Sequence, residues 1–205
     1  MTGTILYGPQ HVGTESVAIP LCDSIYDLTG VAQCDDVSWM DFKEFVAEGT
    51  SPVTGVLNYH LLYELCVNYI CDEENCEHPS DMGVGKAGLW RKIKEEFKSV
   101  IYELFDNCED VYIVTNMKTD KVSHTFHTGD VFSPKLDWIS EDFLPSLCQR
   151  TLAYLPIYRT NKEGKRKEDK IMICSLRPDV YAGDATGELP KQIKSGDILK
   201  TLKGA

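Results

Sequence analysis

Two glycines near the amino terminus stand at the spacing of a phosphate-binding loop. The stretch ILYGPQHVGTES runs from an apolar segment into Gly8 and Pro9, and Gly13 follows five positions after Gly8. In the motif G-x-x-x-x-G-K-[ST], backbone amides wrap phosphate oxygens, the lysine contacts the β- and γ-phosphates, and the hydroxyl holds Mg²⁺. Thr14 and Glu15 occupy the lysine and hydroxyl positions here. The pattern predicts a degenerate nucleotide loop, with an ordinary strand-turn-helix junction as the alternative.

These two replacements disfavour a triphosphate ligand on grounds of charge. Glu15 would bring a carboxylate toward the phosphates, and like charges about 4 Å apart repel by roughly 1–4 kcal/mol at effective dielectric constants between those of water and a protein surface. Thr14 removes the attraction that the lysine supplies. We therefore expect no cofactor, unless ATP and Mg²⁺ bind in a divergent manner.

The composition is that of one globular domain. The chain has 205 residues, of which 42% are hydrophobic and 26% charged, and these values are ordinary for a soluble protein with a single core. No apolar run approaches the length of a membrane span, and the first apolar stretch lacks the features of a signal peptide. We expect a cytoplasmic protein whose eight cysteines are reduced and mostly buried.

The acidic balance of the chain limits how it could bind nucleic acid. The net charge is −11, so overall charge gives no attraction to a phosphate backbone and any contact needs a local basic patch. The segment NKEGKRKED offers such a patch with Lys162, Lys165, Arg166 and Lys167. The alternative is a solvated hairpin tip. The lysine-rich stretch after Pro190 is a second candidate region.

Strand and helix patterns alternate along the chain. Strands are predicted over residues 4–7, 24–28, 52–57 and 111–117, helices over 15–19, 39–48, 60–70, 86–105 and 141–152, and hairpins over 121–132 and 154–176. This order predicts an α/β fold with a mostly parallel central sheet, flanking helices and antiparallel hairpin additions. We expect a single domain over residues 4–192 and a lysine-rich, mobile tail over 193–205.

Segments downstream of the loop resemble a known family. The most specific are PSDMGVG, before the helix predicted at 86–105, and YAGDATGELP near the end of the domain, with VYIVTNMK between them. They are similar, in order, to phage-encoded RecA-like, AAA-type P-loop ATPases associated with DNA recombination, single-strand annealing and replication. The resemblance covers residues 4 to about 192 and implies a RecA-like P-loop core.

The catalytic positions that this resemblance implies are replaced. Besides the two Walker A positions in the loop, the acidic residue expected in YDLTG is Thr29, and the Walker B strand ends at Asn58 instead of aspartate. The sensor position is Asn116, with Lys118 retained after it. Departures at phosphate, metal and water positions together predict that hydrolysis is lost. No catalytic residue is therefore expected.

Three functions follow from these observations. The first is a catalytically inactive ATPase relative that serves as a binding or assembly subunit in phage DNA recombination or replication, as a homo-oligomer or beside an active ATPase, with single-stranded DNA as a further partner. The second is a divergent ATP-binding protein that uses the amides of Gly8 to Gly13 with Lys118 or a lysine of a neighbouring subunit. The third is a scaffold redeployed to bind or inhibit a host protein in the host cytoplasm.

Two further groups have simpler explanations. Cys71, Cys76 and His78 follow the spacing C-x4-C-x-H, which is not a standard zinc motif, and no second ligand pair follows. Core cysteines are the preferred interpretation and a zinc site is the alternative, so no metal is predicted. The glycine-flanked AGDATG segment is expected to form a turn.

Overall fold

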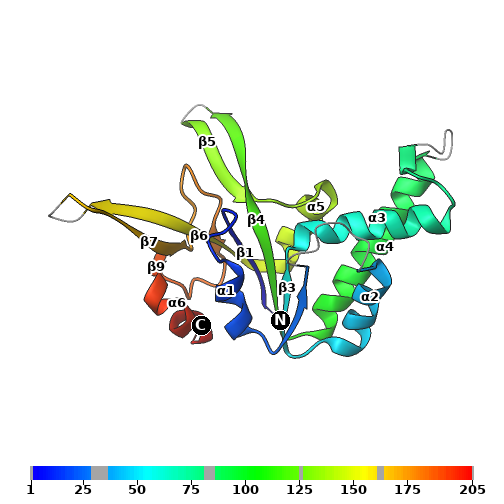
Figure 1. Cartoon of the computed structure of the whole chain (residues 1–205), viewed down its shortest axis with the longest axis horizontal. Helices are drawn as coiled ribbons and strands as arrows, with labels where there is room; N and C mark the ends of the chain where they lie inside the picture. Colours follow the sequence, from blue (N-terminus) through cyan, green and yellow to red (C-terminus); the bar gives the residue numbers. More distant parts are fainter. Residues whose placement is uncertain (1, 29–36, 81–85, 125–126, 161–163, 205) are drawn as a thin grey trace.

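One nine-stranded sheet organises the residues that the structure, a computed structural model, describes: 2–28, 37–80, 86–124, 127–160 and 164–204 (Figure 1). The path through the sheet is β2 (Ser24–Asp27), β3 (Val53–Leu57), β4 (Asp110–His124), β1 (Thr2–Gly8), β6 (Cys148–Thr160), β7 (Arg166–Ile173) and β9 (Gln192–Lys194). Two strands lie off this path, since β5 (His127–Pro134) pairs with β4 and β8 (Gly183–Asp184) pairs with β6.

The centre of the sheet is parallel. Neighbouring strands from β2 through β3, β4 and β1 to β6 all pair in parallel, so β1 lies inside the sheet between β4 and β6. The long strands β4 and β6 continue into antiparallel hairpins with β5 and β7. Both hairpins project from the body of the molecule (Figure 1). The predicted α/β fold, with a mostly parallel central sheet flanked by helices, is confirmed.

Helices cover the two faces of the sheet unequally. One face carries α2 (Trp39–Glu44), α3 (Leu62–Glu73), α4 (Lys86–Asn107) and α5 (Trp138–Leu147), and the other carries α1 (Glu15–Ala18) and α6 (Ile198–Lys203). Because successive residues of a strand point to opposite faces, Ile5 packs in the first core and Leu6 in the second, and both side chains are fully buried.

The helix α4 fits the apolar periodicity predicted over residues 86–105. Leu89, Ile93 and Phe97 are buried along one side of it, and the Phe97 ring stacks on Trp39 of α2 with ring centres 5.6 Å apart. Its opposite side is charged, as expected for an amphipathic helix on a sheet. None of the helices in the described ranges is long and apolar enough to cross a membrane.

The helix predicted over residues 141–152 is too long. The helix α5 ends at Leu147, and β6 follows directly. Arg150 and Leu152 are buried while Gln149 is exposed, which is the alternation of a strand, and this part of β6 pairs with β1. Pairing with a central strand outweighs the helical pattern of the preceding residues.

The segment predicted as a lysine-rich tail begins in regular secondary structure, which extends through Lys203. These residues begin within β9, which pairs with β7, and continue into α6. Ile193, Ile198 and Leu202 are buried in the core shared with α1, whereas Lys203 is exposed. The lysines lie among apolar residues at helical spacing, and burial of those residues fixes the segment to the sheet.

Truncating Leu202 tests whether the carboxyl-terminal segment belongs to the core. Removing a buried leucine side chain is expected to lower the free energy of unfolding by about 2–5 kcal/mol in Leu202→Ala. The neighbouring exposed change Lys203→Ala should stay within about 0.5 kcal/mol of the wild type. Urea denaturation followed by circular dichroism measures both, and equal stabilities of the two variants would contradict the packing described.

Candidate functional site

The carboxyl ends of the parallel strands gather the residues singled out from the sequence. Gly8 at the end of β1 is in register with Asn116 of β4. Asn58 directly follows β3, whose last residue Leu57 is in register with Asp27 at the end of β2. The helix after β1 lies on one face of the sheet and α5, which follows the β4–β5 hairpin, lies on the other. Ligands of open α/β sheets bind at such an edge, where the connections diverge to opposite faces.

The loop after β1 alternates in backbone handedness. His11 and Gly13 have φ angles of 65° and 83°, whereas Thr14 has φ −57° and ψ −37°. Alternating left- and right-handed residues direct successive N–H groups to one concave side, the arrangement called a nest, which binds anions. A positive φ is uncommon for a residue other than glycine, so His11 is held there by the loop. These angles form a tight turn between β1 and α1, in which the Val12, Ser16 and Val17 N–H groups donate to carbonyls of the loop itself.

The side chains around Gly13 pack within the loop. Thr14 is buried, and a Cβ added at Gly8 would lie only 2.6 Å from Thr14 Oγ1 and 2.6 Å from the Tyr154 carbonyl oxygen. Thr14 therefore packs against the start of the loop, where the motif requires a lysine. Ser16 donates through its hydroxyl to the Gly13 carbonyl at 2.6 Å, so this hydroxyl is also engaged within the loop.

Glu15 and Pro9 contribute less than Thr14 to the shape of the loop. Glu15 is the first residue of α1 and is half-exposed. Pro9 accepts a hydrogen bond from the Val12 N–H at 3.3 Å, which tightens the turn. The residue packed against the loop's first glycine is Thr14, and its neighbour Glu15 adds unfavourable charge for a triphosphate.

A lysine from another strand reaches the loop. Lys170 of β7 donates through Nζ to the Val12 carbonyl oxygen at 2.6 Å, and Nζ lies 5.9 Å from the centre of the Tyr154 ring. Lys170 is 158 positions from Val12 in the chain, and only the register of the β6–β7 hairpin brings it to the loop. The sequence pattern contains no signal for this contact.

Asn58 and Asn116 each make local contacts at the ends of their strands. Asn58 adopts the left-handed conformation, with φ 55°, and its carbonyl accepts from the Leu61 N–H at 3.0 Å. The Asn116 amide nitrogen lies 3.4 Å from His60 Nε2. Burial, with a smaller contribution from the Lys135 charge, lowers the pKa of His60 to about 4, so this imidazole is neutral at neutral pH. Sequence reasoning did not single out His60.

Lys118 is engaged with carboxylates. Its ammonium pairs with Glu141 of α5 and lies 3.7 Å from Asp120 Oδ2. These groups line a cavity of about 200 Å³ together with Pro145 and Tyr181. With two carboxylates beside it, Lys118 does not supply a free positive charge for the loop. The ion pair with Glu141 gives Lys118 a structural role.

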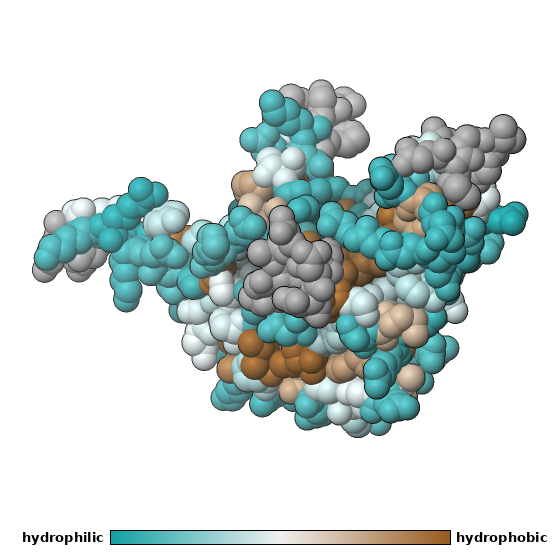
Figure 2. All heavy atoms as spheres, turned by 45° about the vertical axis from the view of Figure 1, so that its right-hand side comes forward, coloured by the Kyte–Doolittle hydropathy of each residue, from teal (hydrophilic) through white to brown (hydrophobic). Residues whose placement is uncertain are grey.

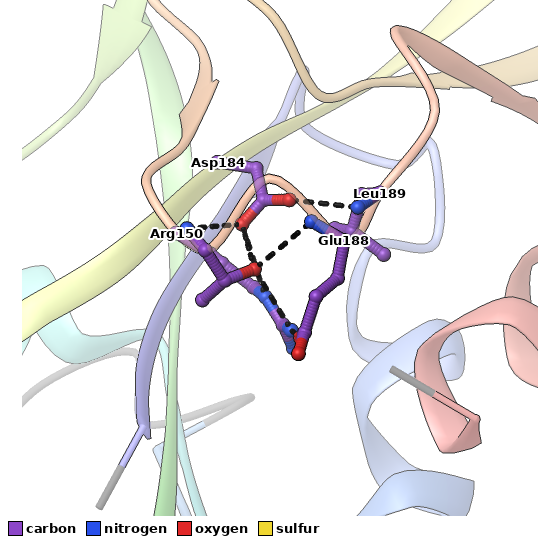
Figure 3. Close-up of polar contacts among 5 residues, drawn as sticks. Arg150, Asp184, Glu188 and Leu189 are labelled. Carbon is purple, nitrogen blue, oxygen red and sulfur yellow. Dashed lines mark hydrogen bonds and ion pairs between the residues drawn. The ribbon is translucent and has the colours of Figure 1, made fainter.

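The AGDATGELP segment is a structural anchor (Figure 3). The Asp184 carboxylate accepts hydrogen bonds from the Thr186 hydroxyl at 2.6 Å and N–H at 3.1 Å, and from the Leu189 N–H at 2.7 Å. Arg150 of β6 donates to the same carboxylate at 3.3 Å and pairs with Glu188 at 2.5 Å. The Arg150 and Asp184 side chains are 5% and 3% exposed, so the pair is buried. The expected turn is present, and it is fixed to β6.

The basic residues described in the segment after Thr160 lie toward the tip of the β6–β7 hairpin. Arg159 and Lys167 are directly opposite each other in the ladder, and both are exposed. The Arg166 guanidinium lies 4.1 Å from the centre of the Tyr158 ring, whose side chain is 55% exposed. Lys165 is exposed next to the tip. Figure 2 shows the hairpin as a hydrophilic projection from the body.

The cysteine-histidine spacing does not correspond to a metal site in the described residues. The Cys76 N–H donates to the Cys71 carbonyl at 2.9 Å where α3 ends, and His78 Nδ1 accepts from the Ser80 N–H at 3.1 Å. Within the described ranges, no three His, Cys, Asp or Glu side chains are grouped to hold a metal ion. Three positions named from the sequence, Thr29, Lys162 and residues 81–85 of the PSDMGVG segment, lie outside those ranges.

No protein-family model matches this chain, and no curated protein matches it. Function is therefore inferred from the geometry of the loop after β1, of the carboxyl ends of the parallel strands and of the two hairpins.

Replacing Asp184 tests the structural role of the buried anchor. Asp184→Asn removes one of the two carboxylates that pair with Arg150, since Glu188 remains 2.5 Å from it, and should lower the free energy of unfolding by about 1–3 kcal/mol at neutral pH. The exposed pair Arg177–Asp179 provides the matched control, since Asp179→Asn should cost at most about 1 kcal/mol.

The difference in unfolding free energy between wild type and Asp184→Asn should depend on pH. Although burial acts in the opposite direction, hydrogen bonds from Thr186 and Leu189 and the Arg150 charge hold the pKa of Asp184 below its ordinary value. A depressed folded-state pKa stabilises the protein above the unfolded-state pKa, near 3.9, and this stabilisation is lost as the pH falls through the folded value. Urea titrations from neutral to acidic pH should show that the difference in unfolding free energy between wild type and Asp184→Asn becomes smaller. A difference that does not change with pH would contradict the lowered pKa of Asp184.

Proposed function

We propose that this protein is a RecA-like P-loop protein whose loop does not support Mg-ATP hydrolysis, and that it serves as a non-catalytic binding or assembly subunit in phage DNA recombination or replication. The strand order supports the fold assignment. In β6–β1–β4–β3–β2 the loop-bearing strand is central, and β4 separates it from the strand that ends at Asn58. This is the order expected of a RecA-like core with its sensor strand between the Walker A and Walker B strands.

The observation that carries the proposal is the contrast between the loop's backbone and its side chains. The positive φ angles at His11 and Gly13 fit a phosphate-binding nest, while the buried Thr14 packs against Gly8 in place of the lysine. Phosphoryl transfer depends on positioning and charge stabilisation by a lysine and a metal ion. A loop that keeps its main-chain shape without the cation supports a scaffold that has lost this chemistry.

The replaced residues around the loop support the same conclusion. Asn58 stands where the resemblance implies a metal-orienting aspartate, and its amide carries no negative charge for Mg²⁺. Lys118 is paired with carboxylates, which argues against the alternative in which it replaces the Walker A lysine. The remaining role for such a scaffold is to bind a partner, a second copy or an active ATPase.

Calorimetric titration with Mg-ATP and Mg-ADP tests the loss of nucleotide chemistry. We expect no binding tighter than about 1 mM and no release of phosphate over the buffer rate. The combined variant Thr14→Lys, Glu15→Ser and Asn58→Asp restores the cation, the hydroxyl and the metal-orienting carboxylate, and is expected to gain about tenfold or more in Mg-ATP affinity.

The single change Glu15→Ser is the control for this titration, because it relieves repulsion without adding the cation. It should bind Mg-ATP more weakly than the combined variant. Micromolar binding of Mg-ATP by the wild type, abolished by Gly13→Trp, would overturn the proposal and favour the divergent ATP-binding protein.

A second function, contact with single-stranded nucleic acid, is favoured by the hairpin tip. Like charges directly opposite in a ladder destabilise it, yet Arg159 faces Lys167 across the strands. Among the described residues, the ion pairs do not include Arg159, Arg166 or Lys167. Because successive residues of a strand point to opposite faces, Tyr158 and Arg166 lie on one face of the ribbon and Arg159 and Lys167 on the other. An exposed ring with an arginine on one face and two unpaired cations on the other can hold a single strand that crosses the ribbon, by stacking and charge. A chain of net charge −11 would bind only locally at this tip.

Fluorescence anisotropy with a labelled oligothymidine tests the hairpin. At low salt the wild type should bind, and the double variant Arg159→Ala, Lys167→Ala should bind more weakly and with a salt slope smaller by about 1.4, because each cation that neutralises a phosphate contributes about 0.7 to the slope. Tyr158→Ala should weaken binding by about 1–3 kcal/mol, since it removes one stacked ring. Lys121→Ala on β4, an exposed lysine outside both candidate regions, is the control and should bind like the wild type. Equal affinities for all four proteins would exclude this site.

A further inference from the structure

The helix α3 ends in a turn that reverses the chain at Asn75. Asn75 has a φ angle of 52°, and its N–H donates to the Asp72 carbonyl oxygen at 3.2 Å. The Cys76 N–H donates to the Cys71 carbonyl oxygen at 2.9 Å. These two hydrogen bonds, together with the left-handed Asn75, define a Schellman motif. Side chains at the positions of Cys71 and Cys76 in this motif commonly contact each other.

This cap brings the two cysteines within the range of a disulfide. With standard bond lengths, the 2.9 Å hydrogen bond holds the Cα atoms of Cys71 and Cys76 no more than about 6.8 Å apart, and disulfides join Cα atoms about 4.4–6.8 Å apart. Cys66 lies five residues before Cys71 in the same helix, where the rise per residue separates the Cα atoms by more than about 7 Å. Only the pair that spans the turn can be bridged, although both pairs have the same spacing in the sequence.

The two cysteines differ in their exposure. Both are thiols in the structure. Cys71 is only 4% exposed, whereas Cys76 is half-buried between the exposed residues Asn75 and Glu77. An oxidant in solution therefore reaches Cys76 first. Redox-sensitive cysteines are accessible to solvent and often lie beside a second cysteine that resolves the oxidised product, and the two residues match these two roles.

We propose that Cys71 and Cys76 are a redox modification site, at which a peroxide converts the two thiols into a reversible disulfide. The Cys76 sulfur attacks one oxygen of hydrogen peroxide, the O–O bond breaks, and the departing hydroxide takes the thiol proton to form water. The Cys71 sulfur then attacks the sulfenic acid formed on Cys76, an S–S bond forms, and the hydroxyl group leaves with the second thiol proton as water. Two electrons pass from the thiols to the peroxide, and a dithiol reductant reverses the change.

The disulfide would fix the end of α3 relative to α4. Glu73 and Glu74, which lie between the two cysteines, pair with Lys92 of α4 at 3.2 and 2.7 Å. In the reduced protein the hydrogen bonds of the cap hold these carboxylates in place, and a covalent link would restrict local opening of the helix end. The site is separate from the loop after β1, so the inference goes beyond the proposed function and does not depend on it.

Oxidation of the full chain with hydrogen peroxide, followed by mass spectrometry, tests the site without any substitution. The intact mass should fall by about 2 Da as two hydrogens are lost, and dithiothreitol should restore it. A glutamate-specific protease cuts after Glu73 and Glu74, so digestion without reductant should give linked peptides that contain Cys71 and Cys76. Absence of a disulfide, or disulfides confined to other cysteines or to links between chains, would overturn the inference.

Substitutions assign the two roles. Cys71→Ala should abolish the disulfide and leave a sulfenic acid on Cys76, which dimedone traps. Cys76→Ala should also abolish the disulfide and leave the buried Cys71 unmodified. Cys66→Ala, a buried change on the same helix, is the matched control and should form the disulfide within about twofold of the wild-type rate. Disulfide formation by Cys71→Ala at the wild-type rate would contradict the proposal. Should Cys71→Ala fail to fold, as judged by circular dichroism, Cys76→Ala and the wild-type peptide map still decide the question.

Hydrogen exchange measures the effect of the disulfide on the helix end. The amides of Asn75 and Cys76 should exchange about tenfold or more slowly in the oxidised than in the reduced protein, because opening of the cap is restricted. The amide of Val17 on α1, far from the site in the chain, is the internal control and should exchange at the same rate in both states. Equal exchange of the Asn75 and Cys76 amides in the two states would contradict closure of the cap by the disulfide.

Discussion

The parallel pairing of β1 between β4 and β6 is the constraint on which the rest of the structure depends. Because β1 is paired on both sides, the chain must leave the sheet abruptly at Gly8, where Thr14 and the Tyr154 carbonyl leave no room for a Cβ. The same register sets Asn116 beside Gly8. Main-chain hydrogen bonds and the two buried cores fix this geometry, so changes in the side chains at the edge need not disturb it.

Under the proposed function, the loop after β1 keeps one part of a phosphate site and lacks the other. The part it keeps is the main-chain turn, with positive φ angles at His11 and Gly13. The charged part requires a cation and a metal-orienting carboxylate, and neither Thr14 nor Asn58 provides one. The lysine and the carboxylate that are replaced in this chain have no part in holding the sheet together. The buried pair of Arg150 and Asp184 has such a part, because it joins the segment after β8 to β6. The AGDATGELP segment thus contributes to the stability of the fold.

The sequence was sufficient for those features that depend on local pattern. Periodicity located α4 and both hairpins, and the glycine spacing located the loop. It could not locate Lys170, since the register of β6 and β7 brings this residue to Val12 across 158 positions. The sequence pattern also did not reveal that Ile198 and Leu202, which lie among the lysines of α6, are buried. In both cases tertiary pairing decides the outcome, and tertiary pairing overrides local propensity.

The β6–β7 hairpin uses its cations in two ways. Near the body of the molecule, Lys170 is half-buried and donates to the Val12 carbonyl oxygen, so its charge stabilises a contact within the fold. Toward the tip, Arg159 and Lys167 are exposed and directly opposite each other, and like charges in such positions destabilise a ladder. Because the paired strands fix the register, this repulsion is a property of the hairpin itself, and a bound polyanion would relieve it.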